Sequence, residues 1–523
     1  MNALLVLYAP PGLTDYLEPL FNGKNSLEMA LERSRQFPSV GKTLLLAGSE
    51  DFLPANEGVC IDRKASWTVK DLLNSLAAHS EGFDLTYFAW VDCPFLDPGL
   101  AKRLADRHLR YAAEYSYADG WPYGIAPELL SPGTAAILAK ILSDDDNGPV
   151  ERDSLFSVLQ KDINAFDIET EISSIDLRCH RLRLCADSKR NLLLLRRFAQ
   201  SGVQVPDTAA IERIIAERPE ILRTLPAFYP IQVYGGCPQA CAYCPWPKTG
   251  DISERRDFMD TKRFDSLLEK IAAFSGDAVI DLSLWGELSL HPQKMELIEM
   301  VLRRPELDLI IETSGIGWKD DELDKSASLA KTAGGRASHS GKNKFRLSWI
   351  VSLDTADPAR YKEIRGPGFA EVNSLAKKLL ALFPNDAYVQ AVRTAGAEDD
   401  IEKFYRSWKE ITPNVSNIII QKYDDFCGFL PRKQASDLSP VQRQPCWHLM
   451  RDMPVLIDGA VPLCREQIAG GGGINLGNAF TEKLEDIWEK GQRFYTEQAG
   501  QISGGKKYDS LCAGCDEYYT YNF

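Results

Sequence analysis

The sequence of 523 residues contains no long hydrophobic run. Its longest purely apolar stretches, such as Leu192 to Leu195, are far shorter than the roughly 20 residues that a membrane-spanning helix needs. The opening residues, MNALLVLYAPPG, carry neither a basic flank nor a long apolar core, so they do not resemble a signal peptide. We therefore expect a cytoplasmic protein without a membrane partner.

An excess of positive charge is absent as well. The 60 Lys and Arg residues are outnumbered by 74 Asp and Glu residues, which gives a net charge of −14. Nucleic acids and anionic membranes attract basic surfaces, so this balance argues against broad binding to either of them. We expect no nucleic-acid partner.

The sequence also lacks the cysteine pattern of a disulfide scaffold. Seven of its twelve cysteines fall into two arrays with spacings of the kind that metal sites use. Such usage fits a reducing cytoplasm. The other cysteines show no grouping and are interpreted as small apolar residues or, for the last, as a plain thiol rather than an outlying ligand: Cys60, Cys93, Cys179, Cys185 and Cys427.

The first array lies in the segment GGCPQACAYCP, residues 235–245, and consists of Cys237, Cys241 and Cys244. A short apolar run before it predicts a β-strand over residues 231–234. Three thiolates on one loop can hold three corners of a cubane iron–sulfur cluster and leave one iron open for a substrate or cofactor. The alternative is three unligated cysteines in a turn.

The CxxxCxxC spacing, with Tyr243 before the last cysteine, resembles the signature of radical S-adenosylmethionine (SAM) enzymes. The resemblance implies that the open iron of a [4Fe–4S] cluster binds SAM. It also implies that an electron from an external donor of the flavodoxin or ferredoxin type cleaves SAM to a 5′-deoxyadenosyl radical. That radical abstracts hydrogen from a substrate, which here is an unknown peptide or small molecule.

Repeated strand–helix units follow from Tyr229 onward, and barrel enzymes built from such units carry their chemistry at the carboxyl ends of the strands. Six strands suit the partial (β/α)6 barrel of the radical SAM family. Residues 319–344, rich in Ser, Lys, Gly and Ala, predict a long surface insertion. Strands are predicted at residues 231–234, 278–284, 307–313, 345–353, 387–392 and 417–422, with helices that include 264–274 and 293–303.

Segments that follow these strands resemble the SAM-contacting motifs of the family. Gly286 and Glu287 match part of its Gly-Gly-Glu-Pro segment, although Trp285 and Leu288 depart from it. A carboxylate suits the ammonium group of SAM, while an exposed loop acid is the alternative for Glu287. The resemblance also implies cofactor contacts for Tyr243, Thr313, Ser314, Ser352 and Asp354, and Arg365 and Arg393 are candidates for carboxylate groups in the pocket or for surface salt bridges.

The second array consists of Cys446, Cys464, Cys512 and Cys515, with 17, 47 and 2 residues between them. Four thiolates can complete a second cubane cluster with no open iron, or a zinc site. The surrounding segments, including the GxxxxC spacing that begins at Gly459, resemble the auxiliary-cluster extension of SPASM and Twitch radical SAM enzymes. Because no cysteine follows Cys515, the resemblance implies a single auxiliary [4Fe–4S] cluster of the Twitch type.

The first part of the sequence predicts a doubly wound α/β domain, with strands at 2–8, 42–47 and 85–91 and a helix at 27–37. The segments PLFNGKNSLEMALER, VDCPFLDP and DGWPYG, followed by Glu128, resemble sugar-nucleotide cytidylyltransferases. In that family the residue that matches Asp92 binds a divalent metal. The glycine-rich phosphate loop and Arg expected after the first strand are missing, so a retained fold without chemistry is the preferred interpretation.

The sequence thus predicts an α/β protein whose order of parts resembles spiro-SPASM proteins. The parts are a nucleotidyltransferase-like domain (1–185), a helical connector (186–228), a radical SAM partial barrel (229–425) and a SPASM/Twitch-like domain (426–523). We expect a radical SAM oxidoreductase or maturase. The alternatives are a nucleotide-sugar transferase with a redox-regulatory iron–sulfur module and a non-catalytic iron–sulfur scaffold.

Overall fold

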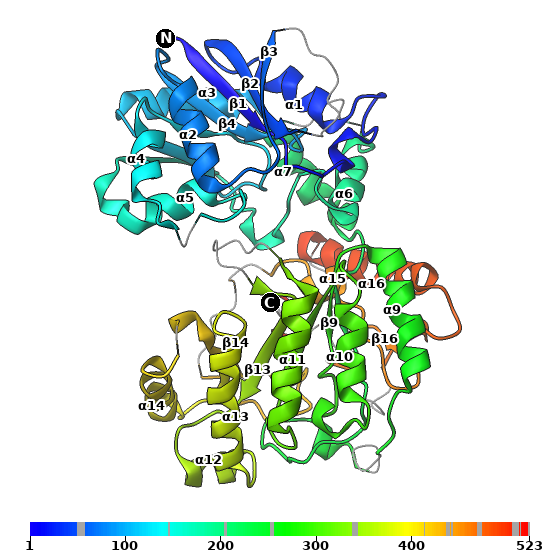
Figure 1. Ribbon diagram of the computed structural model, residues 1–523. Helices are drawn as coiled ribbons and strands as arrows, with labels where there is room; N and C mark the ends of the chain where they lie inside the picture. The colour runs from blue at the N-terminus through cyan, green and yellow to red at the C-terminus, as the bar shows by residue number, and fades with distance from the viewer. Residues whose placement is uncertain are drawn as a thin grey trace. The chain divides into compact units, whose positions relative to one another are not determined.

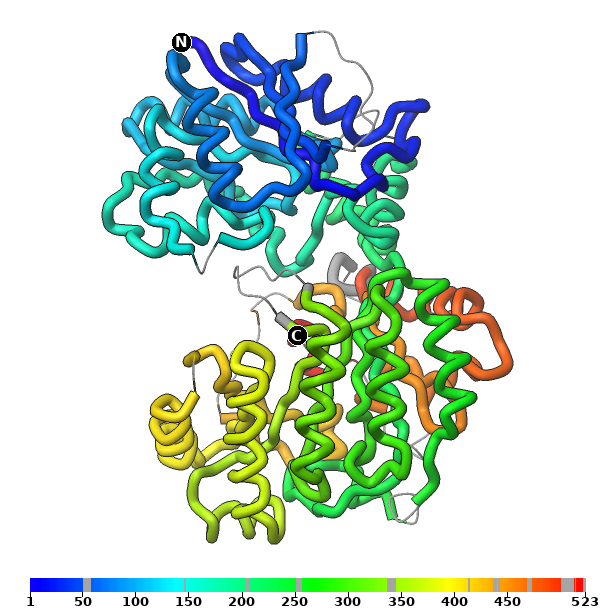
Figure 2. The backbone as a smooth tube through the Cα atoms, viewed as in Figure 1, coloured from blue at the N-terminus to red at the C-terminus, as the bar shows by residue number. Residues whose placement is uncertain are grey.

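The computed structural model divides into two compact units, Met1–Thr224 and Leu225–Arg336 with Lys344–Phe523. Figure 1 labels many of the helices and strands of each unit, and Figure 2 traces the backbone. The residues described are 1–49, 58–144, 147–202, 207–250, 256–336, 344–412, 414–435, 440, 443–467, 473–504, 512 and 514–520.

The first unit is built on a seven-stranded mixed sheet in the order β3-β2-β1-β4-β6-β5-β7. Strand β1 (Ala3–Tyr8) is buried along its whole length and pairs in parallel with β2 (Val40–Gly48) and β4 (Leu85–Trp90). The three strands predicted in this region are confirmed. Because the strand order runs outward from β1 in both directions, the carboxyl ends of β1 and β4 flank the point where such sheets bind ligands. The other elements are β3 (Val59–Lys64), β5 (Tyr115–Asp119), β6 (Glu128–Leu130), β7 (Ile168–Ile172), α1 (Ser26–Ser34), α2 (Val69–His79), α3 (Pro98–Arg110), α4 (Thr134–Ile141), α5 (Ser154–Leu159), α6 (Lys189–Ala199) and α7 (Thr208–Glu217).

The second unit contains a six-stranded sheet in the order β8-β9-β10-β13-β14-β15, and every neighbouring pair is parallel. Strands that follow one another in sequence lie side by side, which is the topology of a partial barrel. Figure 1 shows α9, α10, α11 and α13 lined up over one face of this sheet. The elements are β8 (Phe228–Pro230), α9 (Thr261–Ser275), β9 (Ala278–Asp281), α10 (Lys294–Leu302), β10 (Leu307–Thr313), α11 (Asp320–Ala333), β13 (Leu347–Ser352), α12 (Pro358–Ile364), α13 (Phe369–Leu382), β14 (Ala387–Arg393), α14 (Glu398–Lys409) and β15 (Ile418–Lys422).

Alternation along the six strands divides one face of the sheet into two layers. Side chains two residues apart in a strand point to the same face. An apolar layer takes one side chain from each strand, and the next residues on that face line a cavity at the carboxyl ends of the strands. The apolar layer is Phe228, Val279, Ile310, Ile350, Tyr388 and Ile419, and the cavity layer is Pro230, Asp281, Glu312, Ser352, Gln390 and Gln421.

Two predictions for this unit are wrong. The first strand occupies Phe228–Pro230 rather than residues 231–234, because beyond Pro230 the backbone pairs through single bridges with Val455 and Phe258. The supposed insertion at 319–344 contains helix α11, which begins where the Glu322 carboxylate accepts a hydrogen bond from the Lys319 amide over 2.9 Å. The buried Leu323, Ala327 and Ala330 of this helix face the core. Residues 337–343 lie outside the described residues.

The C-terminal part packs a short segment against the free edge of β8. The amide of Met453 donates to the carbonyl oxygen of Phe228 over 2.9 Å, and the amide of Val455 donates to the carbonyl oxygen of Pro230 over 2.8 Å. None of the helices in the described ranges combines the length and apolarity needed to cross a membrane. The remaining elements are α15 (Trp447–Arg451), the antiparallel pair β16 (Ala460–Pro462) and β17 (Asn475–Asn478), and α16 (Leu484–Gly504).

Candidate active site

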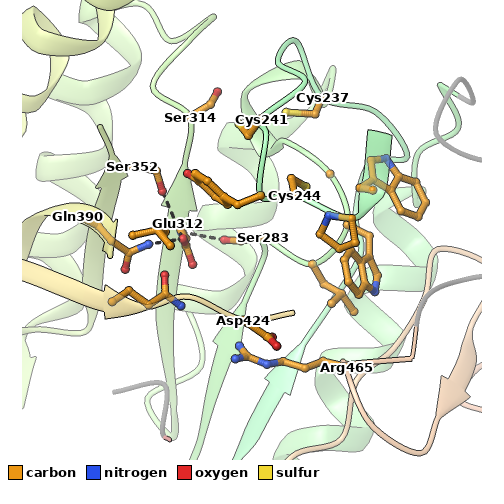
Figure 3. Close-up of a pocket in the computed structure, with 18 of the residues that line it drawn as sticks. Cys237, Cys241, Cys244, Ser283, Glu312, Ser314, Ser352, Gln390, Asp424 and Arg465 are labelled. Atoms are coloured by element: carbon orange, nitrogen blue, oxygen red, sulfur yellow. Dashed lines mark hydrogen bonds between the residues drawn. The ribbon is translucent and has the colours of Figure 1, made fainter. Parts of the chain in front are cut away.

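The loop that leaves β8 carries the first cysteine array to the edge of a cavity of about 260 Å³. Figure 3 shows Cys237, Cys241 and Cys244 grouped on this loop beside the cavity. Burial raises the pKa of the Cys237 thiol to about 12 and that of Cys244 to about 11, and it also raises the pKa of Cys241. Buried thiolates therefore need a compensating cation, which the iron of a cluster supplies. The donor set fits such a group.

The three thiols do not converge as ligands of a single ion would. Among the described residues, the groups whose ligand atoms lie within 4.8 Å of one another do not include these cysteines. In a multi-iron cluster each cysteine binds a different iron, so the sulfurs need not meet at one point. The spacing of the thiols is thus better suited to a cluster than to a mononuclear metal.

Several side chains fix the shape of the cysteine loop. Lys248 donates to the carbonyl oxygens of Ala242 over 3.1 Å and Cys244 over 2.7 Å, while Arg365 donates to Gln239 over 3.0 Å. The guanidinium of Arg365 also donates to the Tyr243 hydroxyl. The Lys248 contacts satisfy backbone carbonyls of the loop that would otherwise depend on water, and the Arg365 contacts hold two of its side chains.

The segment after β9 approaches the cysteine loop so closely that it requires glycine. A Cβ at Gly286 would lie 1.8 Å from the carbonyl oxygen of Tyr234, and the amide of Glu287 donates to Gly236 over 2.9 Å. The preceding Trp285 has a φ of +50°, a conformation that non-glycine residues rarely adopt. Its ring stacks on Trp246 at 6.0 Å, beside Cys244.

Glu287, Thr313 and Ser314, which the sequence assigned to the cofactor site separately, meet in the structure. The buried Glu287 carboxylate accepts hydrogen bonds from the Thr313 hydroxyl over 2.6 Å and from the Ser314 amide over 2.7 Å. Burial raises the pKa of Glu287, and these hydrogen bonds oppose the rise. Within the described part of the chain no cationic side chain pairs with this carboxylate, so its charge is left for a cation in the cavity that all three residues line.

Tyr243 and Asp354 also meet, but their contacts are with the protein. The Tyr243 hydroxyl donates to Asp354 over 2.7 Å, and Asp354 further accepts from the Val392 amide over 2.9 Å. The cavity lining that the structure describes includes Tyr243 and Arg365 but neither Asp354 nor Arg393. Asp354 thus supports the cysteine loop through Tyr243, and its contact with a cofactor stays a prediction.

Sequence reasoning missed the acidic residues of the cavity layer. Ser352, a predicted site residue, donates to Glu312 over 3.3 Å, and Gln390 donates to the same carboxylate over 2.6 Å (Figure 3). Burial raises the pKa of Asp281 to about 7 against the hydrogen bond from Ser283, and the neighbouring Glu312 adds to the rise. The sequence does carry a signal for Asp281 and Glu312. Each is an acidic residue near the end of a mostly apolar strand, two positions after a residue of the apolar layer.

The opposite wall of the cavity comes from the end of β15, the segment after it and the C-terminal domain. It includes Lys422, Asp424, Arg465 and Glu517. Lys422 pairs with Glu517 over 2.8 Å, and Arg465 pairs with Glu466 over 3.0 Å. Burial and the neighbouring Glu466 raise the pKa of Asp424 well above its usual range. These residues were also missed, because no local sequence pattern links them to the cysteine loop.

The four cysteines of the second array gather in the C-terminal domain. Cys446 belongs to an apolar group with Leu449, Tyr495 and Tyr518, against which Cys464 and Cys512 pack. Burial raises the pKa of Cys446 and of Cys464, and the sulfur of Cys515 adds to both shifts. The neighbouring Cys515 and burial raise the pKa of the Cys427 thiol, which was interpreted from the sequence as a plain thiol. The donor set fits an iron–sulfur cluster.

In the first unit, the carboxylate of Asp92 is held by an arginine. Arg152 donates to both of its oxygens, one of them over 2.9 Å, and also to Asp187 over 2.9 Å. The guanidinium lies 4.4 Å from the ring centroid of Trp90. The resemblance to cytidylyltransferases implies that the Asp92 carboxylate binds a divalent metal. In this structure a fixed guanidinium neutralises that carboxylate instead.

Known proteins resemble different parts of the chain. A family model described as the iron–sulfur cluster-binding domain SPASM matches residues 446–516, which span the second cysteine array and confirm an iron–sulfur cofactor there. The crystal structure of BtrN in complex with AdoMet and 2-DOIA is 18% identical, with a TM-score of 0.36, and the match covers 56% of this chain and 94% of BtrN. A cytidylyltransferase from Leptospira borgpetersenii serovar Hardjo-bovis (strain JB197) is 18% identical, with a TM-score of 0.37, over 42% of this chain and 96% of that one.

A protein of Treponema pallidum (strain Nichols), described as an uncharacterized protein, is 34% identical over 376 residues, or 71% of this chain and 98% of its own. The chain belongs to the family of this Treponema pallidum protein, and it carries a SPASM iron–sulfur cluster-binding domain.

Proposed function

We propose that the protein is a radical SAM enzyme whose first cluster is held by Cys237, Cys241 and Cys244. The observation that carries the proposal is the position of this three-thiol loop at the carboxyl ends of six parallel strands, beside a cavity. When bound, the cluster and SAM supply a 5′-deoxyadenosyl radical that abstracts hydrogen from a substrate. The chain supplies the ligands, the cavity and the charges that orient both molecules.

Glu287 is the residue we assign to the ammonium group of SAM. It is 3% exposed, it lines the cavity next to the cysteine loop, and its hydrogen-bond partners Thr313 and Ser314 are neutral. A carboxylate in this setting gains from a cation that can donate hydrogen bonds. Thr313 and Ser314 hold the carboxylate in place, so they act as positioning residues.

The far end of the cavity favours a substrate that carries an amine. Asp281 and Glu312 face it from neighbouring strands, and no ion pair within the described residues satisfies either of them. A substrate ammonium placed between two carboxylates relieves their mutual repulsion. We assign the reaction to the oxidoreductase or maturase type, with electrons from a flavodoxin- or ferredoxin-like donor.

Anaerobic reconstitution with iron and sulfide, followed by SAM and dithionite, tests the proposal. The expected product is 5′-deoxyadenosine, and Cys241→Ala should abolish it. Cys60→Ala, which removes an exposed cysteine of the first unit, is the matched control and should leave the yield unchanged. Equal yield from the Cys241→Ala variant would show that the loop does not hold the reactive cluster, and clusters without SAM cleavage would indicate a scaffold.

The first unit is proposed to be a nucleotidyltransferase-like domain that has kept the fold without the metal chemistry. The contact between Arg152 and Asp92 supports this proposal, because a guanidinium that is only 14% exposed donates to the fully buried carboxylate. Turnover of CTP or UTP that requires Asp92 would contradict it.

A further inference from the structure

Two cysteines of the first unit, far apart in the sequence, meet in its interior. The sulfurs of Cys93 and Cys185 lie 3.7 Å apart, and the Cys93 sulfur lies 3.6 Å from a carboxylate oxygen of Asp92. All three side chains are buried, and their ligand atoms lie within 4.8 Å of one another. Because 92 positions separate the two cysteines, no local sequence pattern reveals this group. Two thiols and a carboxylate in one place form a set of donors that metal ions bind.

The backbone holds these donors in place. The carbonyl oxygen of Asp92, just after β4, accepts a hydrogen bond from the amide of Ala186 over 2.7 Å. Gly124 lies against the same segment, since a Cβ there would be 2.7 Å from the carbonyl oxygen of Leu184 and 3.1 Å from the sulfur of Cys185. A side chain at Gly124 would therefore push Cys185 out of its position. The three donors are brought together by the fold and do not need a ligand to assemble them.

The distances between the donors match the edges of a zinc tetrahedron. With bonds of about 2.3 Å to sulfur and about 2.1 Å to oxygen, two sulfurs lie about 3.8 Å apart, and a sulfur and an oxygen about 3.6 Å apart. The corresponding distances in the structure are 3.7 Å and 3.6 Å. Mg²⁺ prefers oxygen ligands in an octahedral arrangement. Two sulfurs among three donors therefore favour a thiophilic ion such as Zn²⁺.

The charges around the group are compatible with a cation. One guanidinium, that of Arg152, pairs with both Asp92 and Asp187. Its hydrogen bonds do not exhaust the Asp92 carboxylate, because two carboxylate oxygens offer about four lone pairs. Carboxylates that bind a metal are commonly hydrogen-bonded by a second group in this way. Asp92 can therefore accept hydrogen bonds from Arg152 and bind an ion at the same time.

We propose that Asp92, Cys93 and Cys185 form a binding site for Zn²⁺ in the first unit. On binding, each thiol releases its proton to solvent and two zinc–sulfur bonds form, with no transfer of electrons. The two thiolates balance the two positive charges of the ion, so the pair between Arg152 and Asp92 is kept. Water takes the fourth position of the tetrahedron. The ion joins the loop after β4 to the segment that leads into α6, and it stabilises the unit without a reaction at the metal.

The zinc content of the full chain tests the site. Both cluster sites are first filled by anaerobic reconstitution, zinc chloride is added, and unbound ions are removed by gel filtration before zinc and iron are counted by mass spectrometry. We expect the natural protein to hold about one zinc more per chain than Cys93→Ala or Cys185→Ala, with equal iron in all samples. Cys179→Ala, which removes an exposed cysteine of the same unit, is the matched control and should keep the zinc. Equal zinc in the natural protein and in both other variants overturns the proposal.

X-ray absorption at the zinc edge gives a second readout that needs no substitution. The natural chain should show two sulfur ligands at about 2.3 Å and oxygen ligands at about 2.0–2.2 Å. A shell of four sulfurs would place the zinc in the C-terminal cysteine group, and a shell of oxygens alone would indicate binding at surface carboxylates. Either result overturns the proposal.

Calorimetry distinguishes the kind of ion. Zinc chloride should raise the melting temperature of the first unit by about 5 °C, because the ion binds the folded unit in preference to the unfolded chain. Cys185→Ala should show no such rise, and magnesium chloride should produce none in the natural protein. A rise retained in Cys185→Ala, or an equal rise with magnesium chloride, overturns the assignment of a thiolate zinc site.

Discussion

The guanidinium of Arg365 donates to the carboxylate of Asp354 over 2.8 Å, with the two side chains only 5% and 3% exposed. Asp354 lies just past the end of β13, and Arg365 follows helix α12. The same arginine reaches Gln239 and Tyr243 in the cysteine loop. The ion pair thus connects the sheet to the loop that carries the first three thiols.

Replacement of Arg365 by Met should destabilise the second unit, because it leaves the Asp354 charge buried without a partner. The expected loss is about 3–5 kcal/mol in the free energy of unfolding, measured by urea denaturation, together with a lower iron content. The matched control is Arg360→Met on α12, whose ion pairs with Glu363 and Asp400 are more exposed and should change stability by less than about 1 kcal/mol. Similar losses in both variants would contradict the role of the buried pair.

Gly286→Ala should displace the segment after β9 from the cysteine loop, since the new Cβ would overlap the carbonyl oxygen of Tyr234. We expect loss of iron from the first cluster and a lower melting temperature for the second unit. Gly148→Ala is the control, because an added Cβ at Gly148 would meet no heavy atom within 4 Å, and it should behave like the natural protein. Full iron content in Gly286→Ala would argue against close packing of the two loops.

Binding of an amine should depend on pH through Asp281. Because burial raises the pKa of Asp281 to about 7, the side chain is mostly neutral at pH 6 and mostly charged at pH 8. The affinity for n-butylammonium chloride, followed by nuclear magnetic resonance, should therefore rise about tenfold at most over this range. Asp281→Asn should remove the dependence. An identical pH profile for n-butanol would show that charge plays no part.

Arg152→Met should destabilise the first unit by about 3–5 kcal/mol, because Asp92 is fully buried and would lose the guanidinium that neutralises it. Arg107→Met removes an exposed ion pair with Glu169 and should change the stability of the first unit far less than Arg152→Met. Calorimetry with separate transitions for the two units distinguishes the two variants. Equal transition temperatures would mean that the Asp92 charge is compensated elsewhere.

The stability of the first unit should fall with rising pH through Glu128. Burial raises the pKa of Glu128 to about 7, compared with 4.5 as its usual value. Between these values the folded chain holds a proton that the unfolded chain has released, so unfolding becomes easier as the pH increases. Glu128→Gln should be more stable than the natural protein by about 1–3 kcal/mol at pH 8 and nearly equal to it at pH 4.5. The exposed Glu32→Gln should show the same pH profile as the natural protein, and a parallel profile for Glu128→Gln would contradict the assignment.

Local patterns predicted most of the secondary structure of the barrel. The strand at Leu307–Thr313 was found with its observed bounds, because its apolar residues Leu307, Leu309, Ile310 and Ile311 lie between the turn signals Pro305-Glu306 and Ser314-Gly315. Helix α11 was missed because its Ser, Lys and Ala residues resemble a loop by composition, although Leu323, Ala327 and Ala330 repeat with helical spacing. Composition was given more weight than periodicity in that segment.

The two cysteine arrays identified the loop at the edge of the cavity and the iron–sulfur domain near the C-terminus. They did not identify the charged residues that line the cavity. Asp281 and Glu312 reach the cavity through strand alternation, which requires the register of the sheet to be known. Asp424 and Arg465 approach it from segments about forty residues apart, and only the tertiary fold brings them together. Cys427 was interpreted as a plain thiol because Cys515, which raises its pKa, lies far from it in the sequence.

The backbone pairing between β8 and the segment around Met453 has a practical consequence for anyone who shortens this chain. A version that stops before Arg451 would leave the carbonyls of Phe228 and Pro230 and the flanking amides of Ala227 and Gln232 without these partners and free to pair with another molecule. Such a fragment should self-associate rather than behave as a smaller catalyst. The C-terminal domain therefore completes the barrel mechanically, whatever its metal centre contributes to the chemistry.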